Sequence, residues 1–206
     1  MRRKRPLDRK AGAVVRDASL IVIASEDTCA VKQYFDFFRS TRVQFRVLET
    51  ADGKSAPSHI LTRLDAFIDE YQIGEGDELW FVCDCDHWIS SGHIHNLTSV
   101  LMQCRQKNIK TALSNPSFEL WLLLHFAEFP QVDPLNQRSL IEQIRRAVGG
   151  YNKTRVDLLP LTNENVRKAV NRAKANRSTT PIPQHPATDI FRIIEDLLQR
   201  NIISID

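Results

Sequence analysis

The stretch LWFVCDCDHW, residues 79–88, decides the fold, because it carries an apolar strand directly into two aspartates separated by one residue. In an extended chain, residues i and i+2 point to the same side and lie about 7 Å apart, at ~3.3 Å per residue. Asp84 and Asp86 are therefore predicted to project together from the end of a strand. A simple polar turn after a strand has the same composition, so the pair alone leaves both interpretations open.

Alternating strand and helix patterns surround this stretch. Short apolar runs predict strands at 18–25, 43–50 and 109–114, besides the one that ends near Cys83. Apolar residues at helical spacing predict intervening helices at 26–40, 58–72 and 92–108. This order is typical of an α/β fold with a parallel sheet flanked by helices, in which ligands bind at the carboxyl ends of the strands.

The rest of the chain reads as helical. A buried helix is predicted over 115–129, followed by helical segments over 139–147, 163–176 and 187–200. The expected organisation is a basic N-terminal tail at 1–17, an α/β domain at 18–130 and a helical C-terminal extension at 131–206.

Composition and charge narrow the class of protein. No apolar run approaches the ~20 residues of a membrane span, so we expect a cytoplasmic protein with reduced cysteines and no membrane association. Ten acidic residues against two basic ones lie between positions 49 and 86, whereas ten basic residues against three acidic ones lie between 138 and 177. This asymmetry predicts one part that attracts cations and another that attracts anions, although solvated helix faces give the same pattern.

Further carboxylates follow the other predicted strands. Glu26 comes just after the first strand, and parallel strands end at one edge, so Glu26, Asp84 and Asp86 are expected to converge. Three converging acids repel one another, and Mg²⁺ or Mn²⁺, which prefer oxygen ligands, would offset this repulsion. Glu119, one turn into the helix after the fourth strand, is a further candidate, or else it only complements the helix dipole.

Several stretches resemble known families. LIVIASED, WFVCDCDHW, SNPSFELWLLLHF, GGYNKT and HPATDIFRIIEDLL together resemble the RloB-like proteins, which carry a domain similar to the Toprim domain of topoisomerases, primases and OLD-type nucleases. The resemblance implies that Glu26 is a metal ligand or general acid/base, that Asp84 and Asp86 bind metal, and that Asn115 and Glu119 belong to the family's Asn-Pro-x-Phe-Glu element. Two positions depart from the pattern: Asp27 stands where a glycine is usual, and Ala30-Val31 where a Thr-Glu pair is expected.

The expected function is therefore a Mg²⁺- or Mn²⁺-dependent nuclease that cleaves DNA or RNA. The resemblance also implies an ATPase partner in anti-phage defence, and the chain itself has no P-loop. Asn115 and six basic side chains are expected to hold the nucleic acid: Lys153, Arg155, Arg167, Lys168, Arg172 and Lys174. The sequence leaves the oligomeric state open. The alternative is a non-catalytic module that binds nucleic acid or the ATPase, and the departures at Asp27 and Ala30-Val31 favour it. A third interpretation is a phosphotransferase or primase-like polymerase, although the sequence shows no template- or nucleotide-binding element.

Other reactive side chains receive structural interpretations. His87, His93 and His95 are expected to be exposed rather than metal ligands, and His125 to be packed or capping. Cys83 and Cys85 alternate with the aspartates, so they are expected to fill the core on the opposite side.

Overall fold

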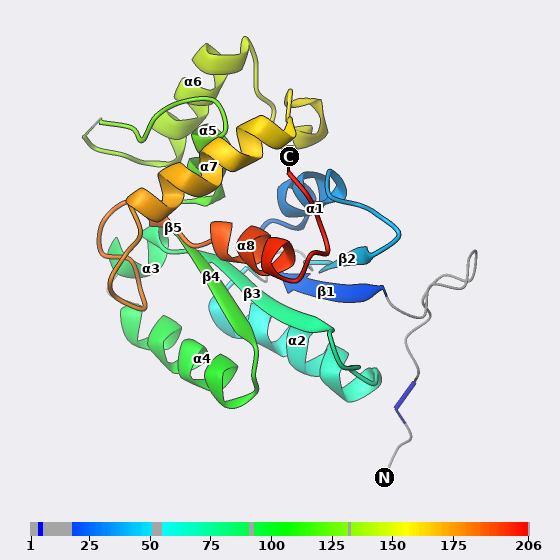
Figure 1. Cartoon of the computed structure of the whole chain (residues 1–206). Helices are drawn as coiled ribbons and strands as arrows, with labels where there is room; N and C mark the ends of the chain where they lie inside the picture. The colour runs from blue at the N-terminus through cyan, green and yellow to red at the C-terminus, as the bar shows by residue number, and fades with distance from the viewer. Residues whose placement is uncertain (1–3, 6–17, 51–54, 91–92, 132, 206) are drawn as a thin grey trace.

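A five-stranded sheet lies between two layers of helices in a computed structural model of the chain, which describes residues 4–5, 18–50, 55–90, 93–131 and 133–205 (Figure 1). The strands are β1 (Ser19–Ala24), β2 (Val43–Leu48), β3 (Glu78–Asp84), β4 (Lys110–Asn115) and β5 (Ala187–Thr188). The helices are α1 (Thr28–Asp36), α2 (Pro57–Glu70), α3 (Asp86–Ser90), α4 (Ile94–Gln106), α5 (Phe118–Leu124), α6 (Gln137–Val148), the 3₁₀ helix η1 (Val156–Leu158), α7 (Asn163–Ala175) and α8 (Phe191–Gln199).

The order of the strands in the sheet is β2-β1-β3-β4-β5. The first four strands pair in parallel, and β5 pairs antiparallel with the end of β4. The predicted α/β class is confirmed. The chain turns outward in opposite directions from β1 and β3, so the carboxyl ends of these two neighbours form the switch point where such sheets bind ligands.

Alternation along β1 divides the interior into two cores. Ile21 and Ile23 face a cluster that includes residues of α1, α5, α6, α7 and α8. Leu20 and Val22 face the opposite cluster, built with α2 and α4. Burial on both faces explains why β1 is a continuous apolar run. The first cluster joins residues from both predicted regions, 18–130 and 131–206, in one core.

Helix α5 lies at the centre of that first cluster. Each of its seven residues is buried, including Glu119 and Trp121. Helices α6 and α7 both pack against α5. The C-terminal helices therefore cover the helix that leaves β4, and this fixes the position of its first turn.

Several predicted boundaries were wrong. The helix predicted over 115–129 spans only 118–124, and the helix predicted over 187–200 begins at Phe191. Residues 187–188 form β5 instead, where the hydroxyl groups of Thr188 and Ser114 are 2.7 Å apart. Helix α3 was not predicted, since a single turn carries no periodic signal.

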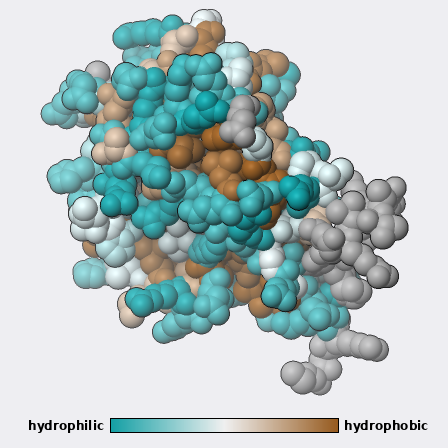
Figure 2. All heavy atoms as spheres, viewed as in Figure 1, coloured by the Kyte–Doolittle hydropathy of each residue, from teal (hydrophilic) through white to brown (hydrophobic). Residues whose placement is uncertain are grey.

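Part of the N-terminal segment and one face of the surface can also be described. Of the predicted basic tail at 1–17, the structure describes Lys4 and Arg5, and Arg5 pairs with Glu70 at 3.1 Å; the rest lies outside the described residues. Figure 2 shows a largely hydrophilic face, with hydrophobic residues between the polar ones near its middle. Within the described residues, no helix combines the length and hydropathy that membrane crossing requires.

Candidate functional site

The register between β1 and β3 places Glu26 at the switch point. Ala24 pairs with Phe81, so the parallel register carried two residues further sets Glu26 beside Cys83. The Cys83 thiol donates a hydrogen bond to Glu26 Oε1 at 3.1 Å, and the Trp88 indole N–H donates to the same oxygen at 3.3 Å. Two elements, β3 and α3, thus hold the carboxylate that follows β1.

The environment of Glu26 favours its protonated form. Burial raises the pKa of Glu26, and the negative charge of Asp86 raises it further, against the two hydrogen bonds from Cys83 and Trp88. A carboxyl group with a raised pKa at a ligand-binding edge is suited to proton transfer or to binding a cation.

Asp84, the last residue of β3, lies between the other carboxylates. Its Oδ1 accepts the backbone N–H of Phe118, the first residue of α5, at 2.9 Å. Desolvation raises the pKa of Asp84 well above its ordinary value, and the charges of Glu26 and Glu119 raise it further, whereas Lys153 opposes them. The charge of Asp84 therefore interacts with two of the predicted carboxylates, Glu26 after β1 and Glu119 in α5.

Asp86 begins α3, so the chain is no longer extended after Asp84. The extended-chain argument for the aspartate pair was wrong at this point, because a helical turn replaces the strand. Asp86 Oδ1 accepts the backbone N–H of His87 at 2.6 Å. Asp86 still interacts electrostatically with Glu26 and Asp84, so it belongs to the same cluster.

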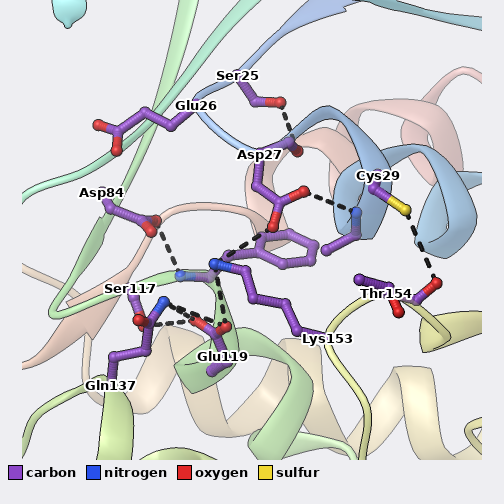
Figure 3. A network of polar contacts seen from close by, with 12 residues as sticks. Ser25, Glu26, Asp27, Cys29, Asp84, Ser117, Glu119, Gln137, Lys153 and Thr154 are labelled. Atoms are coloured by element: carbon purple, nitrogen blue, oxygen red, sulfur yellow. Dashed lines mark hydrogen bonds and ion pairs between the residues drawn. The ribbon is translucent and has the colours of Figure 1, made fainter. Parts of the chain in front are cut away.

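Glu119 is almost fully buried, at 1% exposure. It accepts a hydrogen bond from Ser117 Oγ at 2.7 Å and from Gln137 Nε2 at 3.1 Å (Figure 3). Lys153 Nζ lies 3.7 Å from Glu119 Oε1. Several donors thus offset the cost of removing the Glu119 carboxylate from water. The sequence had suggested the helix dipole as one explanation for a carboxylate at this position.

Lys153 reaches into the carboxylates from the loop after α6. Its Nζ lies 3.2 Å from Asp27 Oδ2, and Figure 3 shows it between Asp27 and Glu119. Asp27 also caps α1, accepting the Ala30 N–H at 3.0 Å. The residue that departs from the family pattern is therefore paired with a lysine from the GGYNKT stretch.

Arg63 on α2 supports the backbone at Glu26, a role that sequence reasoning missed. Its guanidinium donates to Ser25 O at 2.7 Å, to Leu48 O at 3.0 Å and to Thr50 Oγ1 at 2.8 Å. Burial lowers the pKa of Arg63. In the sequence, the only feature that could have indicated this role of Arg63 is its place on a predicted helix in a largely acidic region.

The other residues predicted to contact nucleic acid each pair with another residue of the chain. Asn115 donates to Pro183 O at 2.8 Å, and Arg167 donates to the backbone oxygen of Ile205. The other four form ion pairs: Arg155 with Asp157, Lys168 with Glu164, Arg172 with Glu128 and Lys174 with Glu195. In the described part of the chain, the hydrogen bonds and ion pairs found for these six residues do not involve Glu26, Asp84 or Asp86.

The expected packing of the other side chains is confirmed. His87, His93 and His95 are exposed, Cys83 and Cys85 are buried, and His125 is packed inside. His125 Nε2 lies 3.1 Å from Tyr34 Oη, and its Nδ1 lies 2.9 Å from Trp121 O. The Cys83 thiol nevertheless touches Glu26, which the alternation argument did not foresee.

The donor set can be compared with what a divalent cation needs. Among the described residues, no group of three or more His, Cys, Asp or Glu side chains is arranged to hold a metal ion. Mg²⁺, however, is usually bound by one or two carboxylates and several waters rather than by an all-protein cage. The oxygen donors and the mutual repulsion of Glu26, Asp84 and Asp86 fit an ion held in this open manner.

Comparison with known proteins adds one finding. No curated protein and no solved structure matches the chain. The family model described as RloB-like protein matches residues 21–197, which include most of β1, the D-x-D stretch, α5 and the loop that carries Lys153. The chain therefore belongs to the RloB-like protein family.

Proposed function

We propose that the protein is a Mg²⁺- or Mn²⁺-dependent nuclease of Toprim type that hydrolyses phosphodiester bonds of DNA or RNA. The observation that supports this best is the meeting of Glu26 from the end of β1 with Asp84 and Asp86 from the end of β3, at the switch point of the sheet. Clustered carboxylates at that edge can attract a divalent cation, and phosphodiester hydrolysis is a reaction that carboxylate-bound divalent ions support.

The residues of the chain divide the work. A divalent ion bound here would stabilise the charge that develops on the attacking and leaving oxygens. Glu26 has two roles open to it: it joins Asp84 and Asp86 as a ligand of the ion, or, because its pKa is raised, it retains a proton at higher pH than an ordinary glutamate and delivers it to the leaving oxygen. Asp84 and Asp86 supply the negative charge that attracts the ion, and Cys83 and Trp88 fix the Glu26 carboxylate.

Binding of nucleic acid and of a partner belongs to the same proposal. Lys153 and Arg155 lie on one loop, and α7 carries further basic residues, so backbone phosphates have cations to meet. Such binding weakens steeply with salt. We also propose that a cytoplasmic ATPase partner controls the activity in anti-phage defence, as the family resemblance implies.

The alternative is a non-catalytic module, and one observation favours it. Asp27, which follows Glu26 in the chain and stands where a glycine is usual, pairs with Lys153, so a paired carboxylate occupies a position at which a small residue would leave room for a substrate phosphate. In this alternative the carboxylates have a structural role, and the chain binds nucleic acid or the ATPase without cleaving anything.

Cleavage assays separate the two functions. Purified protein with Mn²⁺ is incubated with plasmid DNA, single-stranded DNA and RNA, as wild type, Asp84→Asn and His93→Asn. His93 is an exposed residue at the start of α4, outside the carboxylate cluster. The nuclease predicts cleavage by wild type and His93→Asn and a loss of at least about 100-fold in Asp84→Asn. Equal cleavage by Asp84→Asn, or no cleavage of any substrate with or without the ATPase, contradicts it.

A further inference from the structure

The carboxylates at the switch point form two groups that share Asp84. Glu26 and Asp86 interact with each other, and Glu26 is held by Trp88 and Cys83. Asp27 and Glu119 form the second group, around Lys153. Asp84 interacts electrostatically with members of both groups. In Figure 3 the Glu26 side chain turns away from Lys153, whereas Asp27 and Glu119 point toward it.

Lys153 occupies the centre of the second group. Its ammonium lies 3.2 Å from Asp27 and 3.7 Å from Glu119, and it interacts electrostatically with Asp84. Because Glu119 is almost completely buried, its charge needs a partner inside the protein. Lys153 is the cation that meets this need among the residues that the structure describes.

A divalent ion and an ammonium group compete for such a position. Both are compact cations that attract carboxylate oxygens, and at a separation of a few ångströms in a partly buried site they repel each other strongly. An ion in the second group would therefore have to displace Lys153 from two carboxylates. An ion in the first group, beside Glu26 and Asp86, leaves these contacts intact.

We propose that Lys153 is the resident second cation of the site, so that the protein binds a single divalent ion, on the side of Glu26 and Asp86. This rests on the proposed function, because it assumes that the cluster binds a divalent ion at all. The Lys153 side chain is 41% exposed, and an ammonium has three donors, so it retains a donor for a phosphate oxygen while it holds Asp27 and Glu119. A scissile phosphate would then lie between the bound ion and Lys153.

The number of bound ions tests the proposal directly. Mn²⁺ is titrated into the protein, and free Mn²⁺ is measured by electron paramagnetic resonance for wild type, Lys153→Met, Lys153→Arg and the control Lys107→Gln. Lys107 pairs with Asp65 at 2.6 Å, at the opposite end of β4 from the site. We expect one ion per chain for wild type, Lys153→Arg and Lys107→Gln, and two for Lys153→Met, where Asp27, Asp84 and Glu119 are left without their cation.

Thermal unfolding gives a second readout. Without metal, Lys153→Met is expected to melt at a lower temperature than wild type, and Mn²⁺ is expected to raise its melting temperature more than that of wild type, because a ligand stabilises the state that it binds. Two ions in wild type, or a single ion in a folded Lys153→Met, overturns the proposal. The wild-type count needs no variant, so the proposal remains testable if Lys153→Met does not fold.

Failure of this inference is distinguishable from failure of the proposed function. Two bound ions together with cleavage leave the nuclease intact and remove the role of Lys153 as a resident cation. One bound ion without cleavage of any substrate supports the role of Lys153 as a resident cation and contradicts the nuclease. No binding of Mn²⁺ by wild type overturns both, because the inference assumes the metal site.

Discussion

The indole N–H of Trp88 donates a hydrogen bond to Glu26, with Nε1 and Oε1 3.3 Å apart, so a fluorescent side chain touches the carboxylate at the switch point. An ion bound by Glu26 would compete with the indole N–H for the same carboxylate oxygen. We therefore expect titration with Mg²⁺ to change the tryptophan emission spectrum. Trp88→Phe removes the reporter and Glu26→Gln removes the ligand, so both variants should lose the change; an unaltered change in Trp88→Phe would contradict this geometry.

Neutralising Glu26 is expected to stabilise the protein. A carboxyl group whose pKa is raised in the fold destabilises the folded state once the pH exceeds its unfolded value, and the full cost is present above the folded pKa. At pH 7, Glu26→Gln should therefore melt about 2–4 °C higher than wild type, which corresponds to ~1 kcal/mol for a domain of this size. The gain should vanish near pH 4, where Glu26 is protonated in both states.

The exposed pair of Glu142 and Arg138 provides the control for this measurement. Glu142→Gln removes a carboxylate of the same size from the surface, and its melting temperature should stay close to wild type at each pH. A lower melting temperature of Glu26→Gln at pH 7 would mean that the hydrogen bonds from Cys83 and Trp88 outweigh the cost of burial.

Arg63 is expected to position Glu26 through the backbone. Arg63→Met removes three hydrogen bonds, to Ser25 O, Leu48 O and Thr50 Oγ1, and leaves these atoms only their hydroxyl contacts with Thr28 and Thr50. We expect a loss of about 1–3 kcal/mol in the free energy of unfolding. The affinity for Mg²⁺, read from Trp88 emission, should fall as well. Arg39→Met, which removes an exposed partner of Asp36, should alter neither quantity appreciably.

His125 is expected to weaken the fold in mild acid. Burial lowers the pKa of His125 to about 4, so the unfolded chain binds a proton near pH 6.5 while the folded chain does not. Stability attributable to His125 is thus lost as the pH falls from 6.5 toward 4, by up to ~1.4 kcal/mol per pH unit. Chemical denaturation of wild type and His125→Gln at several pH values measures this slope, and parallel curves would assign the acid sensitivity to other groups.

The strand and helix order was predictable because β1 and β3 are buried on both faces and α2 and α4 are amphipathic. These patterns are local, so they survive in a single sequence. The two residues of β5 carry no such pattern, and α3 is one turn long. Both have distant partners: Ser114 for β5, and Glu26 for α3, because its carboxylate accepts the indole N–H of Trp88.

Strand-end position identified the first three carboxylates, yet it did not predict how they are arranged. The contact between Glu26 and Cys83 depends on the register of β1 against β3, which a single sequence does not specify. The place of Lys153 depends on α6 and its loop packing beside α5. Lys153 was expected only to hold nucleic acid, whereas the carboxylates that it contacts, Asp27 and Glu119, are more than 30 positions away in the chain.

Strand β5 has a consequence for how the protein is made. Its two residues lie at positions 187 and 188, yet they close the outer side of β4 at Ser114 and Asn115, beside the start of α5. A ribosome releases the first four strands long before it has synthesised this one. The nascent chain should therefore pass through a stage in which the end of β4 is open, and the sheet edge that carries the carboxylates should become complete only after residues 187 and 188 have left the ribosome.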